Sequence, residues 1–312
     1  MTSKKEPEGS DFRTRLEQMT ALARTGDRAA FEREIWADWE TLHDYLTSFV
    51  LDNAGPEFVV PYVNDALPRF LRTLELLPFE KDLDILEFGA NPWLFSILLE
   101  RFFDYRLQFT NFTAATIFDQ SVTRGSQRIR SERYGEDYEF SFTSFNLELV
   151  PPPFAEGSFD VVLFCEILEH LVIDPLAIFP RLYRLLKPGG LLVITTPNAV
   201  RLVNVAYLLA GSNFFDRYHP ENGVYGRHNR EFTVGELERL LPAAGFVECE
   251  VRTADRYDYD RIAIDKDNYE APARLPYTRT TLLALLQSVG ATTENRGDNL
   301  YVRARRPTDP AP

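Results

Sequence analysis

The amino-acid sequence predicts an α/β fold built on a doubly wound, largely parallel sheet. From residue 83 onward, short apolar runs alternate with helical spans, which is the pattern of parallel strands connected by helices. Three of these runs end in a turn or an acidic residue, a position that suits a nucleotide-like ligand. These three runs are LDILEFG at 83–89, FDVVLFCE at 159–166 and LKPGGLLVI at 186–194.

A helical region is expected before the sheet, over residues 11–80, after a polar and disordered tail at 1–10. Its apolar residues recur at steps of three and four, the spacing of one helix face. They are Phe31, Ile35, Trp39, Leu42, Leu46 and Phe49, followed after a break at 53–56 by Phe58, Tyr62, Ala66, Phe70 and Leu74. Such a face must be buried. The face would be buried if the helices cover the sheet, form a lid over the substrate, or pair with a second copy as a homodimer.

Seven strands are expected in the main domain, which we place at residues 81–307. A proline-rich tail is expected after it, at 308–312. The expected strands are near 83–88, 106–111, 139–145, 159–165, 191–196, 246–253 and 299–305. Helices are expected between most of them, including one near 200–210 and one near 279–289. The last strand follows a helix and a Gly297-Asp298 turn.

Composition excludes several functional classes. The chain has 312 residues, 45% of them hydrophobic, and a net charge of −13, which repels polyanions, so a nucleic-acid substrate is not expected. No stretch approaches the ~18 uninterrupted apolar residues of a membrane span. The first residues also lack the apolar segment of a signal peptide, so a cytoplasmic protein is expected.

The three runs resemble the first, fourth and fifth strands of class I S-adenosylmethionine-dependent methyltransferases. The resemblance extends over about 83–305 and is strongest over 159–237. It implies a Rossmann-like sheet of seven strands, mostly parallel, whose last strand inserts antiparallel beside the fifth. It also implies S-adenosylmethionine as the methyl donor, and an acceptor-side insertion at about 197–232.

The resemblance carries over a set of donor-binding positions. Glu87 would hold the methionine amino group, and Gly89 would provide the tight turn after the first strand. Asn111 and Asn146 stand where the family usually has carboxylates beside the ribose and the adenine, and their amides can hydrogen-bond the same groups. The full expected set is Glu87, Gly89, Asn91, Asn111, Asn146, Cys165 and Glu166.

The run after the fourth strand has the pattern E-x-x-E-H, formed by Glu166, Glu169 and His170. On a turn that opens a helix these side chains share roughly one face, and such oxygen and nitrogen donors suit Mg²⁺ or Mn²⁺. With the later His228, the pattern resembles ubiquinone-biosynthesis O-methyltransferases and, more closely, small-RNA 2′-O-methyltransferases, in which it binds metal. Many metal-free methyltransferases carry a similar run that only organises the loop, so both interpretations stand.

The segment 197–232 is rich in polar and aromatic residues and suits a hydroxyl-bearing acceptor. We therefore expect an O-methyltransferase of a small-molecule or glycan-like compound. If a metal is present, Glu166, Glu169, His170 and His228 hold it; otherwise His219 or His228 is the catalytic base. The alternatives are a metal-independent N- or C-methyltransferase and a catalytically silent binding protein with this fold.

Overall fold

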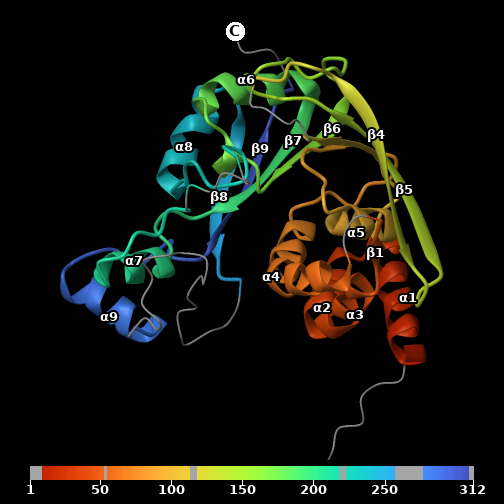
Figure 1. Ribbon diagram of the computed structural model, residues 1–312, viewed down its shortest axis with the longest axis horizontal. Helices are drawn as coiled ribbons and strands as arrows, with labels where there is room; N and C mark the ends of the chain where they lie inside the picture. Colours follow the sequence, from red (N-terminus) through yellow and green to blue (C-terminus); the bar gives the residue numbers. More distant parts are fainter. Residues whose placement is uncertain are drawn as a thin grey trace, which may run out of the picture. The chain divides into compact units, whose positions relative to one another are not determined.

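The computed structural model describes residues 9–52, 55–112, 118–216, 218, 223–256 and 277–308. The chain divides into two compact units (Figure 1). The first comprises residues 1–111 and 123–143, and the second comprises residues 112–122 and 144–312. Most of the two expected tails, at 1–10 and 308–312, lies outside the described residues. The described residues include no helix that is both long and apolar enough to cross a membrane.

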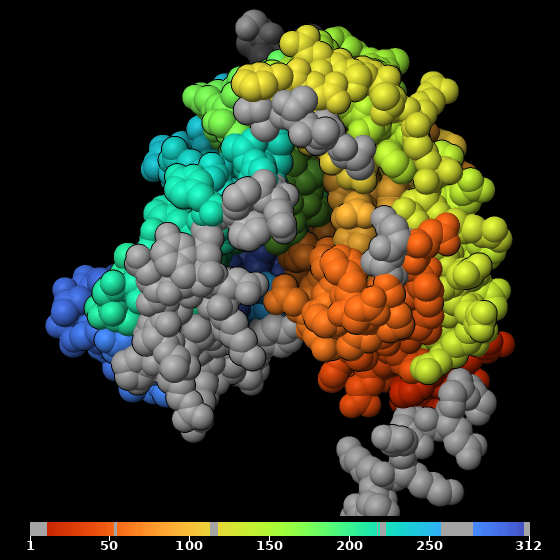
Figure 2. All heavy atoms as spheres, viewed as in Figure 1, coloured from red at the N-terminus to blue at the C-terminus, as the bar shows by residue number. Residues whose placement is uncertain are grey.

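Four helices open the first unit and bury the apolar face that the sequence predicts. They are α1 (Gly9–Thr25), α2 (Arg28–Ala37), α3 (Trp39–Thr47) and α4 (Pro56–Leu74). The Asp27 side chain caps α2 by accepting from the Ala30 backbone N–H. Phe31 is fully buried, and its ring contacts those of Phe79 and Phe102. The space-filling view shows α2 to α4 as one closely packed orange surface (Figure 2).

The same unit contains five strands and one further helix. The strands are β1 (Val50–Leu51), β2 (Asp84–Glu87), β3 (Arg106–Asn111), β4 (Thr123–Ser131) and β5 (Glu136–Ser144), in the order β1-β4-β5-β3-β2. Helix α5 (Leu94–Phe102) follows β2 and is buried along most of its length. Strands β2 and β3 are parallel, and β1 is antiparallel to β4. Arg101 of α5 forms an ion pair with Glu136 at the start of β5, which ties the helix to this strand.

The second unit contains four strands in the order β6-β7-β9-β8. They are β6 (Phe159–Cys165), β7 (Leu186–Pro197), β8 (Val247–Ala254) and β9 (Asn299–Arg305). Its helices are η1 (Leu168–His170), α6 (Pro175–Leu185), α7 (Leu202–Leu209), α8 (Val234–Ala243) and α9 (Arg279–Ser288). Strands β6 and β7 are parallel, and β9 runs antiparallel to β7, as the resemblance implies. Helices α7 and α9 lie side by side (Figure 1), and their buried residues Leu202, Ala206, Tyr207 and Leu282 form an apolar cluster.

The expected count of seven strands, mostly parallel, is wrong in detail. All seven are present, as β2, β3 and β5 to β9, but the described residues contain nine strands with mixed directions. The additional strands are β1, which has only two residues, and β4, whose only large aliphatic side chain is Ile129. Neither carries enough apolar residues to signal a strand. Backbone pairing with neighbouring strands, which sequence periodicity does not report, holds both in place.

Candidate active site

Strand β2 delivers Glu87 to a buried position in the first unit. One of its carboxylate oxygens accepts a 2.7 Å hydrogen bond from Ser96 Oγ of α5. Burial raises the Glu87 pKa from its ordinary 4.5 to about 8, against the opposing effect of the Ser96 hydrogen bond. Gly89 follows two residues later with φ +63°, a left-handed conformation that glycine adopts without steric cost.

The loop after β2 has a single glycine, and a buried aromatic residue fixes the loop. Trp93 is buried and has φ +71°, and its ring stacks on Phe140 at a centroid distance of 5.4 Å. The Ala90 backbone N–H donates to the Thr110 carbonyl at 3.1 Å, which ties the loop to β3. A left-handed residue other than glycine carries strain, and such strain is often found at functional sites. Asn91 is exposed on this loop, and Asn111 is half-buried at the end of β3.

The remaining expected donor-binding residues belong to the second unit. Asn146 is buried, and its Nδ2 donates to the Tyr225 hydroxyl at 3.1 Å. Cys165 is half-buried at the end of β6. Glu166 has φ +54°, and its carboxylate accepts hydrogen bonds from Thr195 Oγ1 at 2.9 Å and Asn299 Nδ2 at 3.2 Å. The structure therefore divides the set, with Glu87, Gly89, Asn91 and Asn111 in the first unit.

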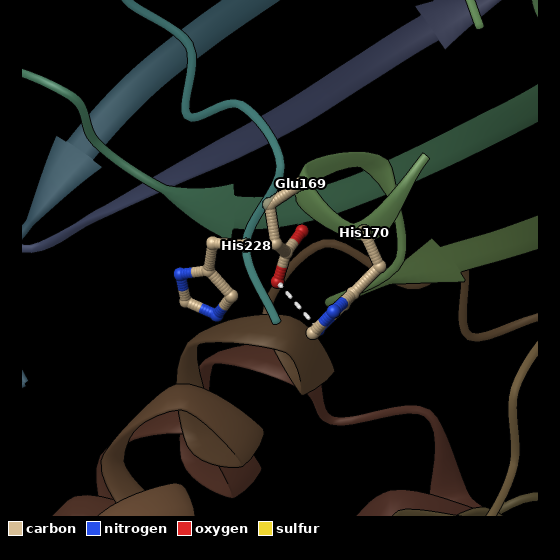
Figure 3. Close-up of side chains that lie close together, drawn as sticks. All are labelled: Glu169, His170 and His228. Carbon is tan, nitrogen blue, oxygen red and sulfur yellow. Dashed lines mark ion pairs between the residues drawn. The ribbon is translucent and has the colours of Figure 1, made fainter. Parts of the chain in front are cut away.

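Three residues of the E-x-x-E-H…H pattern meet in the second unit. One ligand atom from each of Glu169, His170 and His228 lies within 4.8 Å of the other two (Figure 3). Glu169 and His170 come from η1, and His228 comes from the loop before α8. The loop is held against η1, because the Asn229 and Arg230 backbone N–H groups both donate to the Glu169 carbonyl, at 2.7 and 3.1 Å.

The carboxylate of Glu169 is buried and only half satisfied. Its Oε2 accepts from Thr196 Oγ1 at 2.8 Å, whereas Oε1 finds no hydrogen-bond partner within the described part of the chain. The His170 Nε2 atom lies 3.8 Å from this oxygen. Burial, and then the charge of Glu166, raise the pKa of Glu169 to about 8, while His228 opposes the shift. A buried oxygen that lacks a partner is costly, and this oxygen can accept a further hydrogen bond or bind a cation.

The two imidazoles titrate in opposite directions. Burial and the neighbouring His228 lower the pKa of His170. Burial also lowers the pKa of His228, but the hydrogen bond to Glu231 and the charge of Glu169 outweigh it, so the net shift is upward. The surroundings of His170 therefore favour its neutral form, whereas the carboxylates beside His228 favour its protonated form.

The sequence identifies the three clustered residues, and the structure shows which residues hydrogen-bond to them. Glu166 lies outside the group of three, and its role as a metal ligand stays a prediction. His219 lies outside the described residues. Sequence reasoning did not find Thr196 or Glu231. Their signals were a polar residue at the end of the apolar run of β7, and a carboxylate three positions after His228.

Comparisons with known proteins identify the family of the chain. Residues 61–251 match the Methyltransf_23 family of methyltransferase domains. The chain is 26% identical over 231 residues to the ubiquinone biosynthesis O-methyltransferase of Dinoroseobacter shibae, covering 72% of this chain and 84% of that protein. It is 39% identical over 89 residues to the protein of the same name from Cereibacter sphaeroides, covering 28% of this chain and 34% of that one.

Among solved structures, the chain is similar to one in the complex between the Haloferax volcanii Trm112 methyltransferase activator and a methyltransferase. The identity is 16% and the TM-score 0.49, over 79% of this chain and 92% of that one. The family match spans more than half of the sequence, so the chain belongs to the methyltransferase-domain family and is a class I S-adenosylmethionine-dependent methyltransferase.

Proposed function

We propose that this methyltransferase transfers the methyl group to a hydroxyl of a small-molecule or glycan-like acceptor, with the assistance of a divalent metal ion. The observation that carries the proposal is the buried Glu169 Oε1, which has no hydrogen-bond partner in the described residues and lies beside two imidazoles. One carboxylate oxygen and two ring nitrogens are ligands that suit Mg²⁺ or Mn²⁺. Glu169, His170 and His228 would hold the ion, with Glu166 as a fourth ligand.

The donor set fits a cation on electrostatic grounds. Glu166 raises the pKa of Glu169, which means that the two carboxylates repel each other when both are ionised. A divalent ion would neutralise this repulsion, and when bound it would lower the pKa of an acceptor hydroxyl. The chain's own residues would orient the reactants: the Glu87 carboxylate would pair with the ammonium of the donor, and the turn at Gly89 would allow close backbone approach.

An oxygen acceptor is supported by the relatives and by the charge of the chain. Two of the similar proteins carry the name ubiquinone biosynthesis O-methyltransferase. The net charge of −13 disfavours a polyanionic acceptor such as nucleic acid. Polar and aromatic side chains in the segment 197–232 suit an acceptor with several hydroxyls.

His228 as a metal-free general base is the second candidate mechanism. Its pKa is raised, and its Nδ1 atom is hydrogen-bonded to Glu231 at 3.1 Å, which resembles the carboxylate–histidine pairs of general-base catalysis. In this mechanism the Nε2 atom would accept the acceptor's proton, and Glu231 would stabilise the resulting imidazolium.

Chelation separates the two mechanisms once an acceptor is found by incubating extract metabolites with enzyme and labelled S-adenosylmethionine. The metal mechanism predicts that turnover collapses on chelation and returns with Mg²⁺ or Mn²⁺. His228→Ala should weaken metal binding more than donor binding, whereas His43→Ala, at a half-buried histidine of the first unit, should change neither. Full turnover in a chelated, metal-free sample would contradict metal assistance and leave His219 or His228 as the base.

A further inference from the structure

A buried carboxylate that is not one of the proposed metal ligands lies behind His228. The Glu231 side chain is only 5% exposed, and both of its oxygens accept hydrogen bonds. Oε1 accepts from Arg201 Nη2 at 2.8 Å and from His228 Nδ1 at 3.1 Å, and Oε2 accepts from Asn204 Nδ2 at 2.9 Å. Three donors thus converge on one carboxylate, which fixes its position and its ionised form.

The backbone on either side of Glu231 is also fixed. The next residue, Phe232, is buried and forms a parallel bridge to Asn198, and its carbonyl accepts from the Ala199 N–H at 2.9 Å. Thr233 then caps α8 through a reciprocal pair of hydrogen bonds with Glu236. Glu231 is therefore held on a rigid support rather than on a mobile loop.

The partners of the two imidazoles determine their tautomers. An ionised carboxylate and a carbonyl accept hydrogen bonds but do not donate them. His228 Nδ1 must therefore carry the proton that it shares with Glu231, and His170 Nδ1 must carry the proton that it donates to the Arg227 carbonyl at 2.9 Å. Both neutral rings then present an unprotonated Nε2 atom.

We propose that Glu231 is a positioning residue of the active site: held by Arg201 and Asn204, it fixes the ring orientation and the Nδ1–H tautomer of His228. This inference builds on the proposed function, because it assigns the ligand or base role to His228 Nε2. It holds for either mechanism. A metal-ligating histidine usually donates its other ring N–H to a carboxylate or a carbonyl, and the two histidines here have one partner of each kind.

The rival explanation is that the Arg201–Glu231 ion pair only stabilises the fold. Arg201 Nε and Nη1 are buried and have no partner in the described ranges, so Glu231 is the anion that balances this guanidinium. Removing Glu231 alone would strand a buried charge, which is strongly destabilising, whereas replacing both partners by apolar residues is often tolerated. The double variant Arg201→Met/Glu231→Leu therefore separates stability from positioning.

The test compares Glu231→Gln, the double variant and the control Glu238→Gln, which removes one exposed carboxylate from α8. The chain has four histidines, so selective ¹⁵N-histidine labelling with single substitutions assigns each ring. Three quantities are measured in the full chain at a pH where the rings are neutral. They are the His228 tautomer by NMR, Mn²⁺ affinity by titration, and S-adenosylmethionine affinity by calorimetry.

We expect the double variant to lose the Nδ1–H signature of His228. Mn²⁺ affinity should fall by about 10-fold to 100-fold in both Glu231 variants, the usual cost of losing such an outer partner. Donor affinity should stay within twofold of the wild-type value, and Glu238→Gln should match the wild type throughout. A folded double variant with the wild-type tautomer and Mn²⁺ affinity would show that the ion pair is only structural and would overturn the inference.

Failure of the proposed function gives a different pattern. If the wild-type protein does not bind Mn²⁺, the metal role of Glu169, His170 and His228 fails. The His228 tautomer then still decides the role of Glu231: loss of the Nδ1–H form in the double variant supports positioning, and its retention contradicts it.

Discussion

Glu87 and Glu169 are buried glutamates in different units of the molecule, and burial raises the pKa of each to about 8. Glu87 interacts with the neutral Ser96 hydroxyl. Glu169 has a neutral partner too, in Thr196, but it also lies near Glu166 and two histidines. The comparison shows that the same pKa shift accompanies two kinds of site. We propose that Glu87 binds a single ammonium group and that Glu169 binds an ion with several ligands.

The largest effect that separates the two glutamates is expected from Glu169→Gln. The amide has nearly the same size as the carboxylate but carries no charge, so it removes the only anionic ligand of the group of three. Mn²⁺ affinity should fall by more than the ~100-fold that loss of an outer partner costs. S-adenosylmethionine affinity should not change. Both are measured by titration, and a variant that keeps wild-type Mn²⁺ affinity would exclude Glu169 as a ligand.

The reciprocal change, Glu87→Gln, should affect only the donor. A hydrogen bond to a charged group contributes about 1.5–3 kcal/mol, which corresponds to a loss of about 10-fold to 100-fold in affinity. Calorimetric titration with S-adenosylmethionine measures this loss, and Mn²⁺ affinity in the same protein serves as the control. If donor affinity were unaffected, the methionine amino group would have to bind elsewhere.

The strand and turn that carry Glu87 and Gly89 were predicted from the sequence pattern, but the contacts that stabilise them were not. The apolar run before Glu87 predicts β2, and the turn at Gly89 is present with φ +63°. The stack of Trp93 on Phe140 was not predicted, because 47 residues separate the two rings along the chain and no local periodicity connects them. Contacts of this kind depend on tertiary packing and lie beyond the reach of sequence patterns.

For the E-x-x-E-H…H pattern, the spacing predicted the three clustered residues but not the residues that hydrogen-bond to them. Glu169 and His170 are adjacent, and the capping box at Thr233 fixes the end of the loop that carries His228, so local signals identify the set. The contact between Glu231 and Arg201 depends on how the loop packs against the start of α7. That packing joins residues 30 positions apart, and a buried ion pair of this type has no sequence signature.

A matched pair of glycine substitutions tests whether the donor binds at the turn after β2. Gly89 and Gly135 have similar left-handed φ values, +63° and +69°, and Gly135 lies in the turn between β4 and β5. Valine in this conformation should cost about 1–2 kcal/mol of stability at each position. Only Gly89→Val should also weaken binding of S-adenosylmethionine, because its side chain would stand where the donor approaches the backbone. We expect a loss of about 10-fold or more, which corresponds to about 1.4 kcal/mol or more. Urea unfolding and calorimetry measure the two quantities, and equal donor affinities in the two variants would place the donor away from this turn.

The smallest effect, per pH unit, is the pH dependence of stability. Glu87 has an ordinary pKa of 4.5 in the unfolded chain and about 8 in the folded protein, so the folded state binds more protons between these values. The free energy of unfolding of the ligand-free, chelated protein should therefore fall as pH rises from 4.5 to 8. For each such group the slope is at most about 1.4 kcal/mol per pH unit. Urea unfolding at a series of pH values measures it.

Glu87→Gln should flatten this dependence, because it removes one of the groups that take up a proton on folding, and Glu238→Gln should not. Added Mn²⁺ should flatten the contribution of Glu169, whose pKa is also raised to about 8, without changing that of Glu87. These experiments measure the difference between the two glutamates: changes at Glu87 should affect donor binding, and changes at Glu169 should affect Mn²⁺ binding. An unchanged slope in Glu87→Gln would show that folding does not raise the pKa of Glu87, and would contradict its burial in the folded protein.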